Sequence, residues 1–135
     1  MATITRFEDL EIWRFARELY KRLIPLLEHA EEQKLFDLKA QIERSAGSVM
    51  DNIAEGFERD GNREFIQFLA ISKASLGELR SQLFRAFDRK LINQEDLQLL
   101  QENCNTLAAN IAGFMNYLNH SSFKGQKYKS KEQKS

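Results

Sequence analysis

Residues that interrupt helices are scarce in this sequence, which has one proline and six glycines among 135 residues. Proline and glycine are the weakest helix formers, so their scarcity beside many Leu, Ala, Glu, Gln, Lys and Arg residues is typical of long helices rather than sheets. A chain of this length forms one domain of ordinary size. We therefore expect an all-α protein with one hydrophobic core.

Cysteine and long apolar segments are nearly absent as well. The lone Cys104 excludes a disulfide within the chain and suits a reducing compartment. No segment approaches the roughly 18 apolar residues of a membrane span, and residues 1–6 lack the start of a secretion signal. We expect a cytoplasmic protein with no membrane partner.

Net charge is also absent, because 20 basic residues balance 20 acidic residues. The charge is unevenly distributed, since residues 121–135 contain five Lys and one Glu, which leaves 15 basic and 19 acidic residues in residues 1–120. Apolar periodicity ends near Asn119, and a polar segment without it is typical of disorder. We expect a helical domain over residues 1–120 and a basic, disordered tail over residues 121–135.

Apolar periodicity in the first half of the chain predicts two helices. The first should begin near Phe7, because Thr5 and Glu8 match a capping box, and Pro25 should kink or end it near Ile24. The following segment, EHAEEQK, is predicted as a polar connection, and the second helix as resuming near residue 35. The two apolar seams consist of Ile12, Ala16, Leu19, Leu23 and Leu26, and of Leu38, Ile42, Ala46, Val49, Ile53 and Phe57.

The second half of the chain predicts two more helices. Asp60 or Asn62 is the expected N-cap of the third helix, and Asn93, followed by Asp96, is that of the fourth. The seams consist of Phe65, Leu69, Ser72, Leu76, Leu79, Leu83 and Ala86, and of Leu97, Leu100, Cys104, Leu107, Ile111, Met115 and Leu118. Four such helices with short connections form an antiparallel, up-down-up-down four-helix bundle.

One stripe of small or amide side chains lies beside the seam of the second helix, and another, of small side chains, lies almost opposite the seam of the third. They consist of Gln41, Ser45, Ser48, Asn52 and Gly56 in the second helix, and of Ala70, Ala74, Gly77 and Ser81 in the third. A solvent-facing helix usually carries Glu and Lys there, whereas small residues let another backbone approach closely. We expect the bundle to self-associate through flat helical faces; the alternative is that Ala and Ser are simply tolerated helix formers.

Three segments in order carry a resemblance to a known family. They are FEDLEIW from Phe7, QIERSAGSVMDNIAEGF from Gln41 and REFIQFLAISKASLGELRSQL from Arg63. With compatible spacing from Phe7 to about Leu118, the chain resembles the bacterial four-helix-bundle family of proteins encoded in intervening sequences of 23S rRNA genes. The resemblance implies a bundle that assembles as a ring-like homopentamer. It also implies kinship with the accessory protein of diversity-generating retroelements, whose pentameric barrel binds nucleic acid beside a reverse transcriptase.

Polar residues inside the matching segments are interpreted as contacts between helices or subunits. Gly56 falls near the end of the second helix, where it permits a left-handed cap or a close backbone approach. Glu55 is expected to pair with a basic residue such as Arg63 or Lys73. The candidate oligomer or interhelix residues are Asn52, Glu55, Gly56, Ala70, Lys73, Ala74, Gly77, Glu78 and Ser81.

Patterns of catalytic and metal-binding residues are missing. Neither His29 nor His120 follows a Glu at the Glu-x-x-His spacing of di-iron bundles, and Cys104 falls on an apolar seam. We predict no cofactor, no metal and no catalytic residue, and hence a protein that is not an enzyme. The alternative is a small RNA-processing enzyme, because Arg22 and His29 have the Arg-x6-His spacing of all-α ribonucleases that resemble the HEPN group.

Basic residues indicate where nucleic acid would bind. The candidates are Arg80, Arg85, Arg89 and Lys90 in the third helix and just after it, and Lys124, Lys127, Lys129, Lys131 and Lys134 in the tail. Cations at a helix C-terminus also complement its dipole, and a basic tail also confers solubility. Five copies around a ring would gather these groups into a basic rim. The leading hypothesis is a non-enzymatic homo-oligomeric scaffold, a homopentamer, that binds RNA or DNA or a protein partner.

Overall fold

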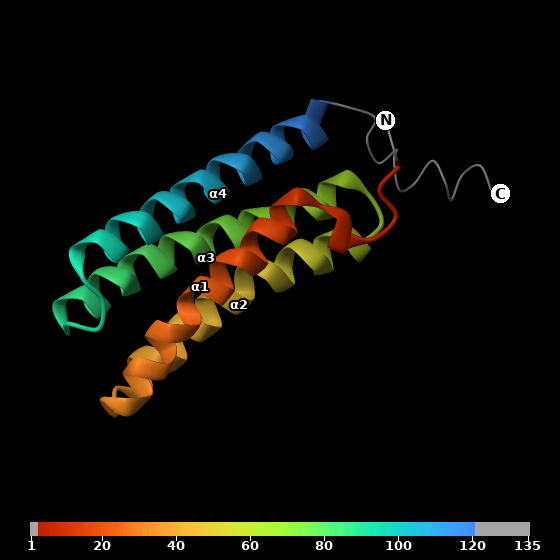
Figure 1. Cartoon of the computed structure of the whole chain (residues 1–135). Helices are drawn as coiled ribbons and strands as arrows, with labels where there is room; N and C mark the ends of the chain where they lie inside the picture. Colours follow the sequence, from red (N-terminus) through yellow and green to blue (C-terminus); the bar gives the residue numbers. More distant parts are fainter. Residues whose placement is uncertain (1–2, 121–135) are drawn as a thin grey trace.

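All secondary structure is helical in residues 3–120, the part of the chain that the computed structural model describes (Figure 1). A short 3-10 helix, η1 (Phe7–Asp9), precedes four α-helices: α1 (Glu11–Glu32), α2 (Phe36–Glu58), α3 (Asn62–Asp88) and α4 (Gln94–His120). The prediction of an all-α chain with four helices is confirmed.

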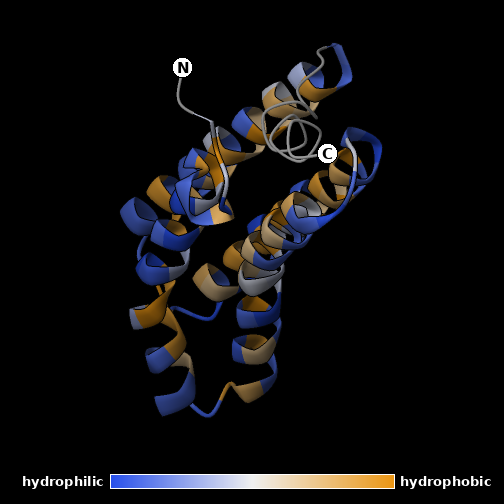
Figure 2. Ribbon diagram, turned by 90° about the vertical axis from the view of Figure 1, so that its right-hand side faces the viewer, coloured by the Kyte–Doolittle hydropathy of each residue, from blue (hydrophilic) through white to orange (hydrophobic). Residues whose placement is uncertain are grey.

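The four helices pack in chain order around one core. Each α-helix contacts the next, most extensively at α2 and α3, and α1 also contacts α4 along a smaller area. The connections are short, so consecutive helices run antiparallel, as in an up-down-up-down bundle. Every helix carries apolar residues along its whole length beside polar ones (Figure 2).

The predicted apolar seams form this core. Ile42, Leu69 and Leu107, from three different helices, are each 0% exposed, and the other seam residues are buried except Met115, which is half-buried. Among residues 3–120, no helix combines the length and the apolar character that crossing a bilayer requires.

The beginning of the first helix differs from the prediction. Thr5 and Glu8 form no capping box, because residues from Phe7 make a 3-10 turn with no side-chain cap and the α-helix starts only at Glu11. Ion pairs hold the turn instead: the Asp9 carboxylate lies 3.1 Å from Arg6 Nε and 3.2 Å from Arg14 Nη2. The ring of Phe7 also packs edge-on against that of Trp13.

The middle of the first helix differs as well, because α1 continues through Pro25 to Glu32. Pro25 lacks the N–H that would bond to the carbonyl of Lys21, but both residues are exposed, so water can bond to that carbonyl. Beyond the proline, Leu27 and Ala30 are buried and extend the core. The helix therefore does not end near Ile24, and of the predicted connection EHAEEQK only Gln33 and Lys34 lie between the helices.

The predicted N-caps have mixed outcomes. Asn93 caps α4 as predicted, since its Oδ1 accepts a hydrogen bond from the Asp96 backbone N–H at 2.7 Å. At α3 the N-cap position is Gly61, and Asn62 instead donates from Nδ2 to the Leu118 carbonyl at 2.9 Å. This bond holds the end of α4 beside the start of α3.

Candidate functional site

The stripe of small residues on α2 lies against α3 in the same chain. The hydroxyl oxygens of Ser48 and Ser75 are hydrogen-bonded at 2.9 Å, and Asn52 Nδ2 donates to the Ser48 carbonyl at 2.8 Å. Deeper in the interface, Ser72 Oγ donates to the Val49 carbonyl at 2.8 Å. The bonds of Ser48 to Ser75 and of Ser72 to Val49 therefore join the two helices of one protomer, whereas the Asn52 bond lies within α2.

Gly56 permits a close approach between the end of α2 and the start of α3. A Cβ atom at this position would lie 2.8 Å from Phe65 Cδ1 and 2.8 Å from Phe68 Cβ, both closer than carbon atoms pack. Gly56 therefore takes part in an interhelix contact, because only a residue without a side chain fits there.

Glu55 pairs with Arg59, the residue that directly follows its own helix. Its Oε1 lies 2.9 Å from Nη2 of Arg59, one turn further along. The expected partners, Arg63 or Lys73, lie on α3, whereas the i,i+4 spacing brings Arg59 close without any tertiary contact. Both side chains of the pair are about half exposed, so it adds little to the stability of the fold.

An exposed face on α3 carries only small side chains, and we call it the α3 face. It consists of the four predicted residues Ala70, Ala74, Gly77 and Ser81. Phe84, which is 49% exposed, follows Gly77 at two helical turns and extends the same side of the helix. The predicted contact residues Lys73 and Glu78 are also exposed and border grooves on opposite sides of this face.

Cations meet an exposed aromatic ring at one end of the bundle. Lys34, Arg85 and Arg89 line a groove of about 380 Å³ together with Phe36, and we call it the end groove. Phe36 is 56% exposed, although a phenylalanine is usually buried. Two carboxylates, those of Asp37 and Asp88, also line the groove and leave it with a small excess of positive charge.

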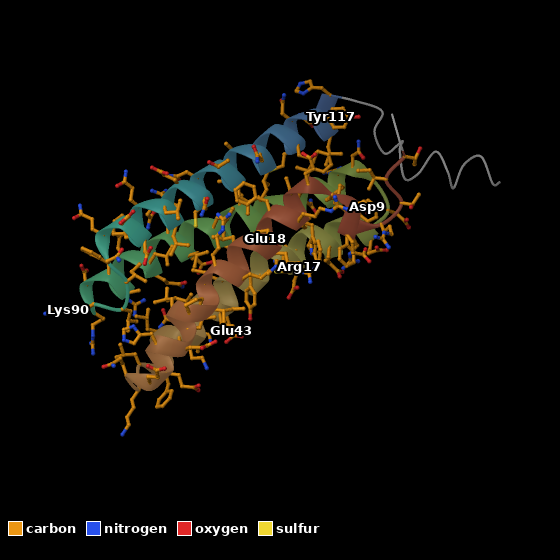
Figure 3. All side chains as sticks on the ribbon, viewed as in Figure 1. Asp9, Arg17, Glu18, Glu43, Lys90 and Tyr117 are labelled. Carbon is orange, nitrogen blue, oxygen red and sulfur yellow. The ribbon has the colours of Figure 1, made fainter. Side chains whose placement is uncertain are left out.

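The other predicted cations lie elsewhere. Arg80 points to α4, because its Nε donates to Gln101 Oε1 at 2.9 Å and Gln101 Nε2 donates back to the Arg80 carbonyl at 2.8 Å. Lys90 projects from the molecule just after the end of α3 (Figure 3) and lines a different groove, with Phe87 and Asp96. The lysines of the tail lie outside the described residues. The structure thus brings Arg85 and Arg89 together but separates Arg80 from them.

Sequence reasoning missed Lys34 and Phe36 in the end groove. Lys34 lies between α1 and α2, in the segment that was expected to connect the two helices, and Phe36 is the first residue of α2. The up-down-up-down topology could have identified them, because it places that connection next to the end of α3.

Arg22 and His29 line one groove of about 450 Å³ between α1 and α4, together with Asp96. They lie two turns apart on α1, so their side chains project from the same side of the helix. His29 Nδ1 lies 3.2 Å from the Leu91 carbonyl oxygen. Nδ1 therefore donates to that oxygen, which leaves Nε2 as the second ring nitrogen for other contacts.

Cys104 is a buried thiol with no solvent exposure. Burial raises its pKa to about 12, an effect that the nearby Arg80 charge only partly offsets. The thiol is thus neutral near pH 7, where a nucleophile or a metal ligand would have to be a thiolate. Among residues 3–120, no three His, Cys, Asp or Glu side chains gather as potential metal ligands.

Comparison with known proteins identifies the family. No curated protein matches the chain significantly. The sequence profile described as 23S rRNA-intervening sequence protein matches residues 8–113, which include the whole interface of α2 and α3, the α3 face and the end groove. With most of its length covered by this match and four helices in the expected order, the chain belongs to the family of 23S rRNA-intervening sequence proteins.

Proposed function

We propose that this protein is a non-enzymatic scaffold that assembles from several copies, as a homopentamer, and binds RNA or DNA at its end groove. The observation that carries the proposal is the α3 face, an exposed helical surface without a charged side chain at its four central positions.

Assembly through the α3 face follows from its shape and chemistry. Ala70, Ala74 and Gly77 border a groove of about 400 Å³ between α3 and α4, which Lys73 and Arg80 also line. We expect this groove to receive side chains of a second copy. Phe84 then becomes covered, and the removal of its apolar surface from water favours association. Because this face is separate from the interface of α2 and α3, a protomer can keep its core while it binds its neighbours.

Nucleic-acid binding follows from the composition of the end groove. The guanidinium groups of Arg85 and Arg89 can bind phosphate oxygens, and Phe36 offers an exposed ring on which a base can stack. A single groove has only a small excess of positive charge, so one protomer would bind weakly. Five grooves on one particle would bind one strand together, with affinity from multivalency.

The assembly is tested by the particle mass from light scattering. We expect the double variant Ala74→Glu/Gly77→Glu to reduce the mass to that of one chain, because two carboxylates would be buried in each interface. The control Thr106→Glu/Ala109→Glu adds the same charge to exposed positions of α4 and should leave the mass unchanged. A wild-type protein with the mass of one chain at high concentration contradicts the proposal.

Nucleic-acid binding is tested by titration of labelled single-stranded RNA at two salt concentrations. We expect Phe36→Ala and Arg85→Gln/Arg89→Gln each to weaken binding about tenfold or more, and the arginine double variant also to flatten the salt dependence. The control Lys21→Gln/Arg63→Gln removes two exposed cations elsewhere. Equal losses in this control would show binding through charge alone, without a defined site.

The second candidate function, an RNA-processing enzyme, is favoured by one observation: Arg22 and His29 line the same groove. In this case labelled RNA should be cleaved by the wild type, and His29→Ala should abolish the cleavage. Intact RNA after incubation with the wild-type protein favours the scaffold.

A further inference from the structure

A groove along α2 beside α3, which we call the acidic groove, has no part in the proposed function. It has a volume of about 840 Å³. Three carboxylates, those of Glu43, Asp51 and Glu78, line it beside one cation, Arg44. Its hollow shape comes from the short side chains of α2, because Gly47 has nothing within 4 Å of the position of a Cβ atom. The groove is thus open and rich in hydrogen-bond acceptors.

A buried amide adds another acceptor to this groove. Gln82 lines the acidic groove with only 8% of its surface exposed, and its Oε1 has no hydrogen-bond donor among the described residues. A buried carbonyl oxygen without a donor is unfavourable, and most such groups in proteins have a partner. Gln82 therefore indicates a ligand that carries N–H donors. A cationic ligand would satisfy both the amide and the carboxylates.

The chain itself contains a segment with this chemistry. Residues 121–135 include five Lys and one Glu, and each lysine ammonium carries three N–H donors. The bond from Asn62 to the Leu118 carbonyl places the end of α4, which this segment follows in the sequence, beside the start of α3. Ser75, in the acidic groove, lies thirteen residues further along α3, which is about 20 Å. Fifteen extended residues span up to about 50 Å, so the segment can reach the groove.

We propose that residues 121–135 bind in the acidic groove of their own chain, with lysine side chains at Asp51, Glu78 and the Gln82 carbonyl. Charge complementarity and the unpartnered amide select this occupant. Binding withdraws the lysines of this segment from nucleic acid, so the segment and the end groove act separately. Loss of the proposed scaffold function would leave this contact unaffected, because the acidic groove lies within one chain.

The proposal is tested with a fluorophore attached to a Ser130→Cys variant of the full chain. Only the new cysteine reacts, because Cys104 is buried. In the wild-type background we expect the dye to rotate with the whole particle. The variant Asp51→Asn/Glu78→Gln should release the segment and shorten the rotational correlation time at least threefold, as should salt at 0.5 M. Gln82→Leu keeps the side-chain volume but removes the carbonyl oxygen. It should shorten the rotational correlation time less than the double variant does, without lowering the melting temperature.

A control variant and two further measurements test whether residues 121–135 of the same chain occupy the acidic groove. Glu28→Gln/Glu32→Gln removes two exposed carboxylates from α1 and should leave the rotation unchanged. Fast rotation in the wild-type background, or equal effects of both double variants, overturns the proposal. Slow rotation that is lost on dilution and restored by added unlabelled chain also overturns it, because the segment would then occupy the groove of a neighbouring copy.

Discussion

At the scale of single residues, Gly56 is the glycine of the described residues where an added Cβ atom would overlap its neighbours. We predict that Gly56→Ala lowers the free energy of unfolding by about 1–3 kcal/mol, because the added methyl group would overlap Phe65 and Phe68. Urea denaturation followed by circular dichroism measures the change.

The control for this substitution is Gly113→Ala on α4. A Cβ atom there would have no neighbour within 4 Å, so the substitution should stabilise the helix by roughly 0.5–1 kcal/mol through helix propensity alone. A neutral or stabilising effect of Gly56→Ala would contradict this prediction. It would show that α2 and α3 can move apart at this point without a loss in the free energy of unfolding.

Cys104 offers a second prediction at this scale. The thiol of Cys104 is fully buried and its pKa is raised to about 12. At pH 8, the rate at which a thiol reagent labels the native protein should therefore be lower than the rate for the unfolded chain by a factor on the order of 10³ or more. Labelling with and without denaturant measures the ratio. Rapid labelling without denaturant would mean that the end of α3 and α4 open frequently.

The same thiol should make stability depend on pH in the alkaline range. The folded pKa of about 12 exceeds the ordinary value of 9.0, so only the unfolded chain ionises as the pH rises above 9. The stability of the wild type relative to Cys104→Ala should therefore fall by about 1.4 kcal/mol between pH 7 and pH 10. Denaturation of both proteins at the two pH values measures this difference, and a constant difference would contradict it.

At the scale of helices and their connections, two lysines occupy an unusual backbone conformation. Lys34 follows α1 with a φ of 60°, and Lys90 follows α3 with a φ of 63°. At each end, the next residue closes the helix with a backbone bond to the fifth residue before it, from Leu35 to Ala30 at 2.8 Å and from Leu91 to Ala86 at 2.9 Å. These are Schellman motifs, which usually have glycine at the left-handed position.

We predict that Lys90→Gly stabilises the protein by about 0.5–1 kcal/mol, because glycine adopts this conformation without strain. Thermal unfolding by calorimetry measures the gain. Lys90→Ala is the matched control, since it removes the same charge but keeps the Cβ atom, and it should not stabilise. Equal gains in both variants would attribute the effect to charge.

The helices were predictable from the sequence because periodicity depends on local spacing. Leu69, Leu76 and Leu83 recur every seven residues, and all three are 0% exposed. The errors concern features that tertiary contacts decide. Pro25 should kink or end a helix by local rules. The burial of Leu27 and Ala30 beyond it nevertheless stabilises the continued helix.

At the scale of the whole molecule, the candidate sites were less predictable than the fold. The sequence assigned both small-residue stripes to self-association, but Ser48 of the α2 stripe bonds to Ser75 of α3 in the same chain, whereas Ala70 lies on an exposed face. Spacing within a helix gives the direction of a side chain and not the identity of the surface it meets. The end groove was missed for the same reason, since Lys34 and Arg89 are brought together only by the packing of α2 against α3.

The exposed Phe84 leads to a prediction about the assembled particle. If copies associate through the α3 face, the native state is stabilised by mass action, and the melting temperature should rise with protein concentration. Phe84→Ser should reduce this dependence, because it removes the largest apolar side chain from the interface, while the stability of a dilute protomer should change by less than about 0.5 kcal/mol.

Phe36→Ser is the matched control, because Phe36 is similarly exposed but lies on α2, in the end groove, and is not part of the α3 face. Calorimetry over a hundredfold range of concentration should show the wild-type dependence for Phe36→Ser and a weaker one for Phe84→Ser. A melting temperature of the wild type that is independent of concentration, with a particle mass of one chain, would leave the α3 face exposed to water. The small residues of α3 would then be no more than tolerated helix formers.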